Sequence, residues 1–415
     1  MLALLLLLPV DAGWTGFLGP PTATADYGDL PIEWTPETVS LTIDLDGYGQ
    51  SSPVVADGTV YLTSVEGENK ETNRVAAYSL ADGSQRWTAT QPNPTPEPNN
   101  FYVSRAAPTP VADSDGVVAF FEGGRLVAYD TKGEQRWTRD LVEDFGPIKA
   151  RHGLSGSLVQ DDDHVFVHVE READPYVLAV KKSDGSDAWK VAGLSSTTWA
   201  SPMQIQGPDG QPQLLVSAAG SVAGLDPATG EQLWRLDGLA GNTAPTPYPV
   251  GPGRFLIGGS GGREDPNAAA SNGLVEISKT DDGYAAAFAW QADKARSSFG
   301  SPIAAGGIAY FVNRSGALFA HDVETGEPVF TKRIAESGWA TPLATDDRVY
   351  FVGKDGTTTV IATGREFEQL AENRTWEAAA TPGRFGSGPV QYAVAAVEAT
   401  LLIRRGDKLY VIRKA

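Results

Sequence analysis

The 415-residue sequence is strongly acidic, with 52 acidic against 33 basic residues and a formal net charge of −19, and it contains no cysteine. Because a phosphate-binding surface needs clustered lysine and arginine, the charge excludes nucleic acid as an expected partner. The missing cysteine excludes disulfides, cysteine-ligated zinc, c-type haem attachment and an acylated N-terminal cysteine. Abundant Gly and Pro, with ten Trp and no long amphipathic stretch, indicate a β-rich globular chain.

The first twelve residues form an apolar run that ends in Val10-Asp11-Ala12. The run is too short to span a bilayer, but it fits the apolar region and cleavage site of a secretory signal. No Lys or Arg precedes it, so we expect a signal peptide over 1–12 with a truncated basic region, and a periplasmic or extracellular protein without a transmembrane segment in the mature chain. A buried N-terminal strand is the alternative.

Residues 13–50 form a lead-in segment that ends in the alternating run Val39–Asp44. A period of two predicts a strand. The chain ends on a second strand-like run, 408–413, that no hairpin follows. We therefore expect these two runs to pair, so that strands from both termini close the fold and leave no exposed sheet edge there.

From residue 51 to residue 415 the sequence repeats. The segment Gly224–Trp234 combines a small residue, an Asp-containing turn, a Gly and a returning Trp, and imperfect copies span 77–87, 128–137, 179–189 and 320–330. A second landmark, usually a small residue followed by Pro, opens an apolar run in each unit. The eight landmarks are Ser52-Pro53, Ala107-Pro108, Ser157-Leu158, Ser201-Pro202, Ala244-Pro245, Ser301-Pro302, Thr341-Pro342 and Thr381-Pro382.

The landmarks lie 40 to 57 residues apart, so the eight units share a core length near 40 residues and vary by insertion. Such units predict one closed repeat array rather than several domains. We predict an all-β fold, an eight-bladed β-propeller of four-stranded antiparallel blades over 51–415. The fifth unit departs most from the repeat, because Trp290 follows its turn at Gly283 at a longer spacing.

Ligands of propellers usually bind at the mouth of the central channel, where loops enter the innermost strands. The residues three positions before each landmark are expected to form one ring there: Gln50, Arg105, Ser155, Trp199, Asn242, Phe299, Trp339 and Ala379. Aromatic, amide and guanidinium groups around a funnel suit a sugar, a peptide or a flat ring system. The alternative is that the aromatic residues only plug the channel or pack under loops.

No catalytic or metal-binding constellation stands out. His164 and His168 are four positions apart, which on a strand separates their side chains by about 13 Å, too far for one metal ion. Asp161-Asp162-Asp163 lacks the rest of a calcium-binding loop. No nucleophile elbow or phosphate loop occurs. We therefore expect no catalytic residue and no metal.

The repeat resembles the tryptophan-docking motif of pyrroloquinoline-quinone (PQQ)-like eight-bladed propellers, which Gly224–Trp234 matches in full. The lead-in, with Trp14, Phe17 and Gly19-Pro20, is similar to that of secreted bacterial members. In that family each such Trp wedges between neighbouring blades. The resemblance implies structural docking roles for Trp87, Trp137, Trp189, Trp234 and Trp290, with Phe330 as a substitute.

The family has an enzymatic and a non-enzymatic branch. Quinoprotein dehydrogenases of this kind carry an adjacent Cys pair and a Glu, Asn and Asp set that holds calcium; this chain has no Cys, and no motif places the calcium ligands. The other branch, which includes the propeller of the outer-membrane β-barrel assembly machinery, is cofactor-free. We expect an exported, monomeric, non-catalytic scaffold that binds a protein or ligand. The alternatives are a PQQ- and calcium-dependent oxidoreductase with atypical ligands, or a carbohydrate-binding propeller.

Overall fold

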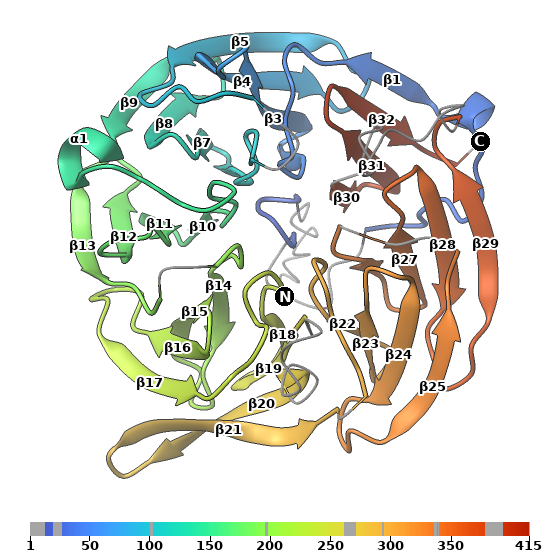
Figure 1. The fold of residues 1–415 in the computed structure, drawn as a ribbon. Helices are drawn as coiled ribbons and strands as arrows, with labels where there is room; N and C mark the ends of the chain where they lie inside the picture. The colour runs from blue at the N-terminus through green and yellow to red at the C-terminus, as the bar shows by residue number, and fades with distance from the viewer. Residues whose placement is uncertain are drawn as a thin grey trace, which may run out of the picture.

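A computed structural model shows a closed ring of eight four-stranded antiparallel sheets around one axis (Figure 1). The predicted eight-bladed all-β fold is confirmed. The structure describes residues 13–19, 27–99, 103–195, 198–260, 271–292, 294–335, 338, 340–377 and 393–414. The expected signal peptide, 1–12, lies outside these residues. Among them, no helix is both long enough and apolar enough to cross a membrane.

Blades 1 to 4 follow one another in the chain, each from its innermost to its outermost strand. Blade 1 contains β2 (Val54–Ala56), β3 (Thr59–Glu66), β4 (Thr72–Ser79) and β5 (Gln85–Pro92). Blade 2 contains β6 (Val111–Asp113), β7 (Gly116–Phe120), β8 (Arg125–Asp130) and β9 (Gln135–Asp140), followed by the short helix α1 (Leu141–Phe145). Blade 3 contains β10 (Val159–Gln160), β11 (His164–Val169), β12 (Tyr176–Lys181) and β13 (Asp187–Ala192). Blade 4 contains β14 (Met203–Gln206), β15 (Pro212–Ala218), β16 (Ser221–Leu225) and β17 (Gln232–Asp237).

Blades 5 to 7 continue in the same order, and blade 8 combines the two ends of the chain. Blade 5 contains β18 (Tyr248–Gly251), β19 (Arg254–Ile257), β20 (Gly273–Thr280) and β21 (Gly283–Gln291). Blade 6 contains β22 (Ile303–Ala305), β23 (Ile308–Val312), β24 (Ala317–Asp322) and β25 (Pro328–Arg333). Blade 7 contains β26 (Leu343–Ala344), β27 (Arg348–Val352), β28 (Thr357–Ala362) and β29 (Gln369–Arg374). Blade 8 contains β30 (Ala393–Val397), β31 (Thr400–Arg405), β32 (Lys408–Ile412) and β1 (Leu41–Asp44), which a 3-10 turn, η1 (Pro36–Thr38), precedes.

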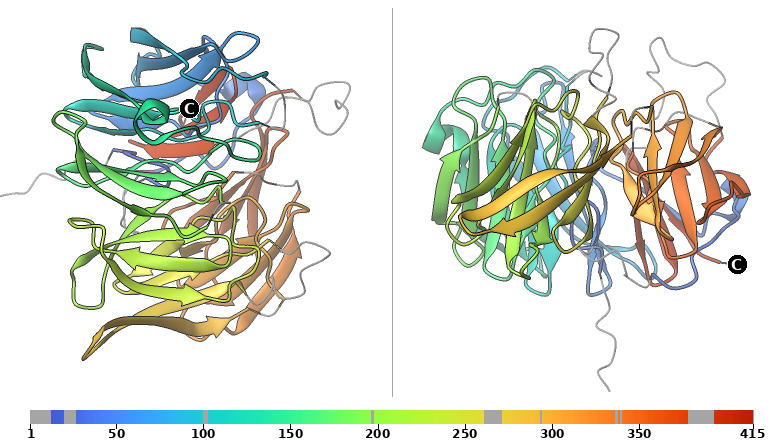
Figure 2. Two further views of the ribbon diagram at one scale, coloured as in Figure 1. Left: turned by 60° about the vertical axis from the view of Figure 1, so that its left-hand side comes forward. Right: turned by 90° about the horizontal axis from the view of Figure 1, so that it is seen from below.

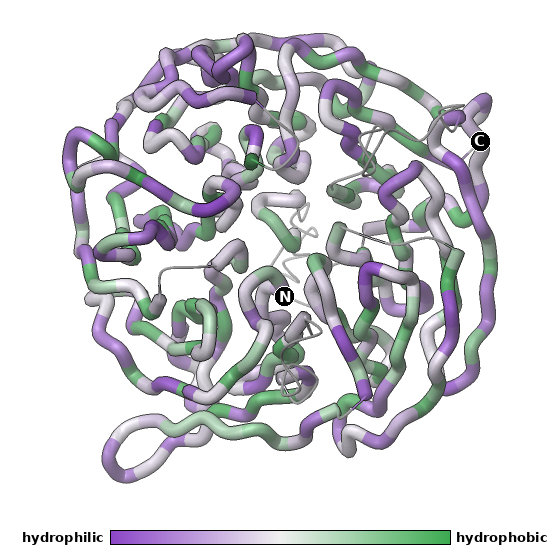
Figure 3. Tube along the Cα trace, in the orientation of Figure 1, coloured by the Kyte–Doolittle hydropathy of each residue, from purple (hydrophilic) through white to green (hydrophobic). Residues whose placement is uncertain are grey.

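The position of a strand within its blade determines its pattern of burial. The inner strand β7 is buried at all five positions, because each face of its sheet packs on a neighbouring blade. The outer strand β5 alternates between half-buried and exposed residues. Hydrophobic and hydrophilic segments accordingly alternate along the rim of the ring (Figure 3). In Figure 2 the ring is seen from its edge, and neighbouring blades lie side by side.

Tryptophan docking on the next hairpin joins neighbouring blades at four of the eight junctions. Four indole Nε1 groups donate to a carbonyl in the hairpin of the next blade, at 2.8–3.0 Å: Trp87 to Thr131, Trp137 to Lys182, Trp189 to Pro227 and Trp290 to Val323. Each indole lies so close to the turn glycine of that hairpin that an added Cβ would fall 2.5–2.7 Å from it, at Gly133, Gly185, Gly230 and Gly326. The glycines are therefore needed for this close approach as well as for their positive φ.

Three junctions are built differently. Phe330 packs on Phe367 in the next hairpin, with ring centroids 5.7 Å apart. Trp376, which the repeat did not predict, stacks on Tyr410 of blade 8 at 5.5 Å. Trp234 stacks on Phe255 of blade 5 at 6.0 Å, but its Nε1 donates to Gln213 Oε1 in its own blade at 2.7 Å.

Blade 8 closes the ring as the sequence predicted. Strand β1 pairs with β32 in antiparallel register, with Leu41 opposite Val411. The guanidinium of Arg404, fully buried in β31, crosses to blade 1 and donates to Ser51 Oγ at 2.6 Å and to the Thr63 carbonyl at 2.6 Å. Burial lowers the pKa of Arg404 to about 10, so it remains charged at neutral pH.

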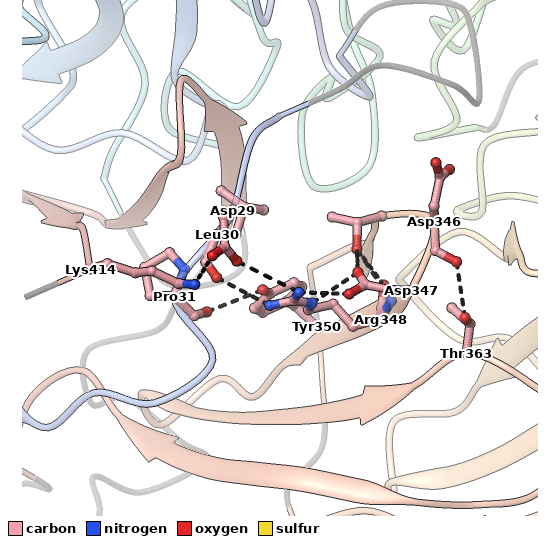
Figure 4. Close-up of polar contacts among 10 residues, drawn as sticks. Asp29, Leu30, Pro31, Asp346, Asp347, Arg348, Tyr350, Thr363 and Lys414 are labelled. Carbon is pink, nitrogen blue, oxygen red and sulfur yellow. Dashed lines mark hydrogen bonds and ion pairs between the residues drawn. The ribbon is translucent and has the colours of Figure 1, made fainter.

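The lead-in is held against blade 7 before it reaches β1 (Figure 4). The Tyr350 hydroxyl donates to the Pro31 carbonyl at 3.1 Å, and Arg348 Nη1 donates to the Leu30 carbonyl at 3.2 Å. Arg348 also lies 3.8 Å from the Asp29 carboxylate. Burial raises the pKa of Tyr350 to about 12, so this hydroxyl stays a donor across the physiological range.

Candidate binding site on the propeller axis

A belt of hydroxyl side chains surrounds the axis where the chain enters the innermost strands. The backbone N–H of each member donates to the hydroxyl of the next, at 2.9–3.1 Å from blade 1 to blade 7: Ser52, Thr109, Ser157, Ser201, Thr246, Ser301 and Thr341. These buried amides would otherwise lack partners, because no strand lies on the axial side of the first strand in each blade. The belt therefore links seven blades and places a polar ring around the channel.

A cavity of about 420 Å³ lies within this belt. Its described lining consists of Phe17, Gln50, Ser52, Val103, Ser104, Ala107, Thr109, His152, Ser155, Ser157, Trp199, Ser201, Ala244, Thr246 and Phe299. Hydroxyl and aromatic groups predominate, and none of these side chains is an acid, a lysine or an arginine. The described lining can therefore stack a ring and hydrogen-bond it, but these residues offer no fixed charge.

The lead-in contributes Phe17 to this cavity. Residues 13–19 lie at the centre of the ring (Figure 1). The Trp14 carbonyl accepts a hydrogen bond from the Val55 amide at 2.7 Å, and the Thr15 carbonyl accepts one from the Ala112 amide at 3.1 Å. Blades 1 and 2 thus hold the segment that presents Phe17 to the site.

Two further aromatic side chains, Trp199 and Phe299, line the cavity. Trp199 is half-buried; its Nε1 donates to the Gly153 carbonyl at 3.1 Å, and its ring lies 6.0 Å from that of His152. Phe299 is 44% exposed and is the single large hydrophobic side chain that the described residues expose. Phe299 also lines the cavity, so a ligand there can contact its ring.

The predicted ring is brought together in part. Gln50, Ser155, Trp199 and Phe299 line the cavity. Trp339 and Ala379 lie outside the described residues. Arg105 and Asn242 are both buried and do not line it.

The error at Arg105 and Asn242 has a simple cause. Blades 2 and 5 carry two prolines each, in Pro108-Thr109-Pro110 and Pro245-Thr246-Pro247. The hydroxyl belt shows that the second proline of each pair is equivalent to Pro53 of blade 1. Counting from the first proline shifts the register by two residues, and the lining positions are Ala107 and Ala244.

Arg105 and Asn242 instead support the loops that frame the cavity. The Arg105 guanidinium lies 3.6 Å from the centre of the Tyr48 ring, and the Arg105 amide donates to Gln50 Oε1 at 2.8 Å. Asn242 is fully buried; its Nδ2 donates to the carbonyls of Ala218 and Ser221, and its Oδ1 accepts from a backbone amide of the same turn.

A charged cluster built on the buried residues Lys70 and Glu122 contacts Ser104 of the cavity lining. Lys70 Nζ contacts Glu97 Oε1 at 2.6 Å, donates to the Ser104 carbonyl at 3.1 Å and lies 3.7 Å from Glu122. The Glu122 carboxylate accepts the Ala106 amide on both oxygens, at 3.1 Å each. Burial raises the pKa of Glu122. Sequence reasoning missed this cluster, because its members are dispersed over fifty residues of chain.

The residues that the structure describes in the axial cavity do not fit a quinone cofactor with calcium. PQQ is a tricarboxylate, which needs cationic partners, and calcium needs several carboxylate or carbonyl oxygen ligands. The described lining contains no Lys, Arg, Asp or Glu, and its single side-chain carbonyl oxygen, Gln50 Oε1, already accepts the Arg105 amide. No group of three or more His, Asp or Glu residues that could hold a metal occurs in the described part of the chain. The buried ring of His168, for example, contacts a single carboxylate, that of Glu170.

Comparison with known proteins agrees with this architecture. A family model described as outer membrane protein assembly factor BamB matches residues 11–167 and 218–415. The structure of BamB from Moraxella catarrhalis has a TM-score of 0.61 at 15% identity, with 90% of this chain and 98% of that chain covered. No curated protein matched the sequence.

Two enzyme structures are similar as well. Quinohemoprotein alcohol dehydrogenase from Comamonas testosteroni has a TM-score of 0.61 at 14% identity, with 97% of this chain and 81% of that chain covered. The quinohemoprotein alcohol dehydrogenase ADHIIG from Pseudomonas putida HK5 has a TM-score of 0.59 at 13% identity, with 96% and 80% covered. Identities this low establish a shared fold alone. The family match extends over most of the sequence, and the chain therefore belongs to the PQQ-like propeller family described as outer membrane protein assembly factor BamB.

Proposed function

We propose that the protein is an exported, non-catalytic propeller that binds other proteins through its axial cavity. The observation that carries this proposal is that the described residues lining the cavity of about 420 Å³ include no Lys, Arg, Asp or Glu. Its volume lies in the range of small-ligand sites and accommodates an apolar or aromatic side chain of a bound segment. Membership of a family named for outer membrane protein assembly supports a protein partner and a periplasmic location.

The chemistry of the lining supports a neutral aromatic group as the part that enters. Phe17, Trp199 and Phe299 offer ring faces and edges, each able to contribute about 0.5–1.5 kcal/mol beyond simple burial. The belt hydroxyls use their oxygen to accept backbone N–H groups, which leaves an O–H on residues such as Ser157 and Ser201 to donate to the ligand.

An oxidoreductase is less well supported, because the described lining has no Lys or Arg to pair with the carboxylates of PQQ and no Asp or Glu to bind calcium. Thermal unfolding of the mature protein with and without PQQ and calcium tests this choice. A ligand at about 100 times its Kd adds about 2.7 kcal/mol of stability. We expect no shift in Tm; a clear increase would contradict the proposal and identify the protein as cofactor-binding.

A titration with model ligands tests the cavity itself. We expect N-acetyltryptophanamide to bind the wild-type protein and to bind Trp199→Ala at least about tenfold more weakly, since one stacking partner and its buried area are lost. Thr331→Ala, on the outer strand of blade 6, serves as a control for general effects of substitution. Binding of methyl glucoside in place of the indole would instead support the carbohydrate-binding alternative.

A further inference from the structure

The outer hairpin of blade 5 extends beyond the ring. Its strands β20 and β21 contain eight and nine residues and pair up to Thr280 and Gly283. Figure 1 shows the hairpin reaching past β17 at the rim. A Cβ at Gly283 would meet nothing within 4 Å. The tip is therefore not covered by an indole, unlike the turns at Gly230 and Gly326.

The outer strand β21 differs in composition from the other outer strands. It reads GYAAAFAWQ, without a charged residue, and is the longest of the eight. Each of the other seven carries at least one charge: Arg86, Arg136, Asp187, Arg235, Lys332, Glu372 and Asp44. In Figure 3 β21 is a green stretch that leads from the hydrophilic tip of the hairpin.

The two faces of β21 have different surroundings. Tyr284 and Phe288 pack against the core that includes Leu215 and Trp234 of blade 4. On the other face Ala285, Ala287 and Ala289 are exposed. One edge of β21 pairs with β20, and no strand pairs with the other edge in the described part of the chain.

Exposed strand edges are normally protected by charged side chains, proline or a covering segment, because unpaired N–H and C=O groups recruit further strands. In the described part of the chain β21 has no charged side chain, no proline and no covering strand. Its β-bulge, another feature that protects edges, lies between Phe288 and Trp290 and leaves Gly283 to Phe288 in regular register. We propose that the free edge of β21 is a docking site for an extended segment of another protein, which adds a fifth strand to blade 5. Backbone hydrogen bonds would provide affinity, and small alanine side chains leave room for the side chains of the added strand.

The charges around β21 define the segment it binds. Asp281 and Asp282 are both exposed at the tip of the hairpin. A net charge of −19 opposes pairing with a second copy. The preferred occupant is therefore a neutral, alternating apolar and polar strand that carries Lys or Arg at the end next to Asp281 and Asp282. This site is separate from the axial cavity, so either proposal can fail alone.

The test measures binding of a fluorescent synthetic peptide of alternating threonine and valine that ends in two lysines. We expect binding to wild type, and a Kd at least about tenfold higher for Ala287→Lys, which places a charge at an exposed position of the edge. Thr331→Lys makes the matched change at an exposed position of β25 and should bind as wild type does. Circular dichroism and Tm establish that both variants fold.

A double variant tests whether the two carboxylates at the tip of the hairpin contribute to binding. Asp281→Asn with Asp282→Asn should weaken binding of the lysine peptide at low salt and have a smaller effect at high salt. Equal binding by wild type and Ala287→Lys, or no binding by wild type, would overturn the proposal. So would a dimer in light scattering that Ala287→Lys dissociates, because the occupant would then be a second copy.

Discussion

The junction between blades 3 and 4 and the junction between blades 4 and 5 solve one packing problem in two ways. In the first, Trp189 covers Gly230 and donates to Pro227, so the hairpin of blade 4 is held against its neighbour. In the second, Trp234 donates within its own blade to Gln213, and the next hairpin extends past it.

This difference separates two roles that the same repeat can have. A docked hairpin gains packing and loses freedom to contact anything else. An undocked hairpin must be held by other contacts. Asp209 of blade 4 accepts hydrogen bonds from Tyr284 Oη at 2.8 Å and from Lys279 Nζ in the blade 5 hairpin. Because Trp234 does not dock on the blade 5 hairpin, strand β21 remains accessible while Asp209 holds the hairpin in place.

Removing Trp234 should have the largest effect. Trp234 is 4% exposed, and we expect Trp234→Ala to lower the free energy of unfolding by about 3–5 kcal/mol through the cavity it leaves. Trp189→Ala should cost less, because Trp189 is only half-buried. Guanidinium unfolding compares the two. A larger loss for Trp189→Ala would show that docking on the turn glycine, rather than burial, dominates the junctions.

The turn glycines give a smaller and sharper contrast. Gly230 has φ +76°, and a Cβ would lie 2.6 Å from the Trp189 ring, so Gly230→Ala should cost about 2–4 kcal/mol from strain and overlap. Gly283 has φ +126°, and a Cβ added there would meet no atom within 4 Å. Gly283→Ala should therefore lower the free energy of unfolding by about 1–2 kcal/mol, from backbone strain alone. Equal losses in denaturant midpoint would mean that the indole yields freely to a methyl group.

We expect the smallest effect from the contact of Asp209 with Lys279 and Tyr284, which holds the blade 5 hairpin. This effect should be visible mainly in how the contact depends on pH. Hydrogen bonds from Lys279 and Tyr284 lower the pKa of Asp209 to about 2. Because the folded pKa is depressed, the contact contributes fully above the ordinary value near 3.8 and is lost as pH falls through about 2. Carboxyl NMR, with Asp209→Asn to identify the resonance, measures this titration. A midpoint near 3.8 would show that the contact does not persist in solution.

The repeat made most of the fold predictable from sequence. Apolar runs, Asp and Gly turns and returning aromatics are local signals that recur, so the number of blades and the pairing of β1 with β32 could be inferred. Trp376 could not be inferred, because no turn motif precedes it at the repeat spacing. Its position depends on stacking with Tyr410, a contact between different blades.

The axial site was less predictable, for reasons that particular residues make clear. In blades 2 and 5 a choice between two prolines decided whether Arg105 and Asn242 or Ala107 and Ala244 would face the channel. Only the hydrogen bonds of Thr109 and Thr246 to neighbouring blades resolve that choice. Phe17 reaches the cavity because blades 1 and 2 bind its segment, which no local pattern encodes.

The pairing of β1 with β32 also has a kinetic meaning. Lys408 of β32 contacts Asp44 of β1 across 364 positions of chain, so blade 8 can form only after both segments are available. Closing so long a loop is entropically costly and slow. During synthesis from the N-terminus, β1 must wait while seven blades are made. The ring is therefore expected to close last, and the period before closure is when the chain most needs protection from aggregation.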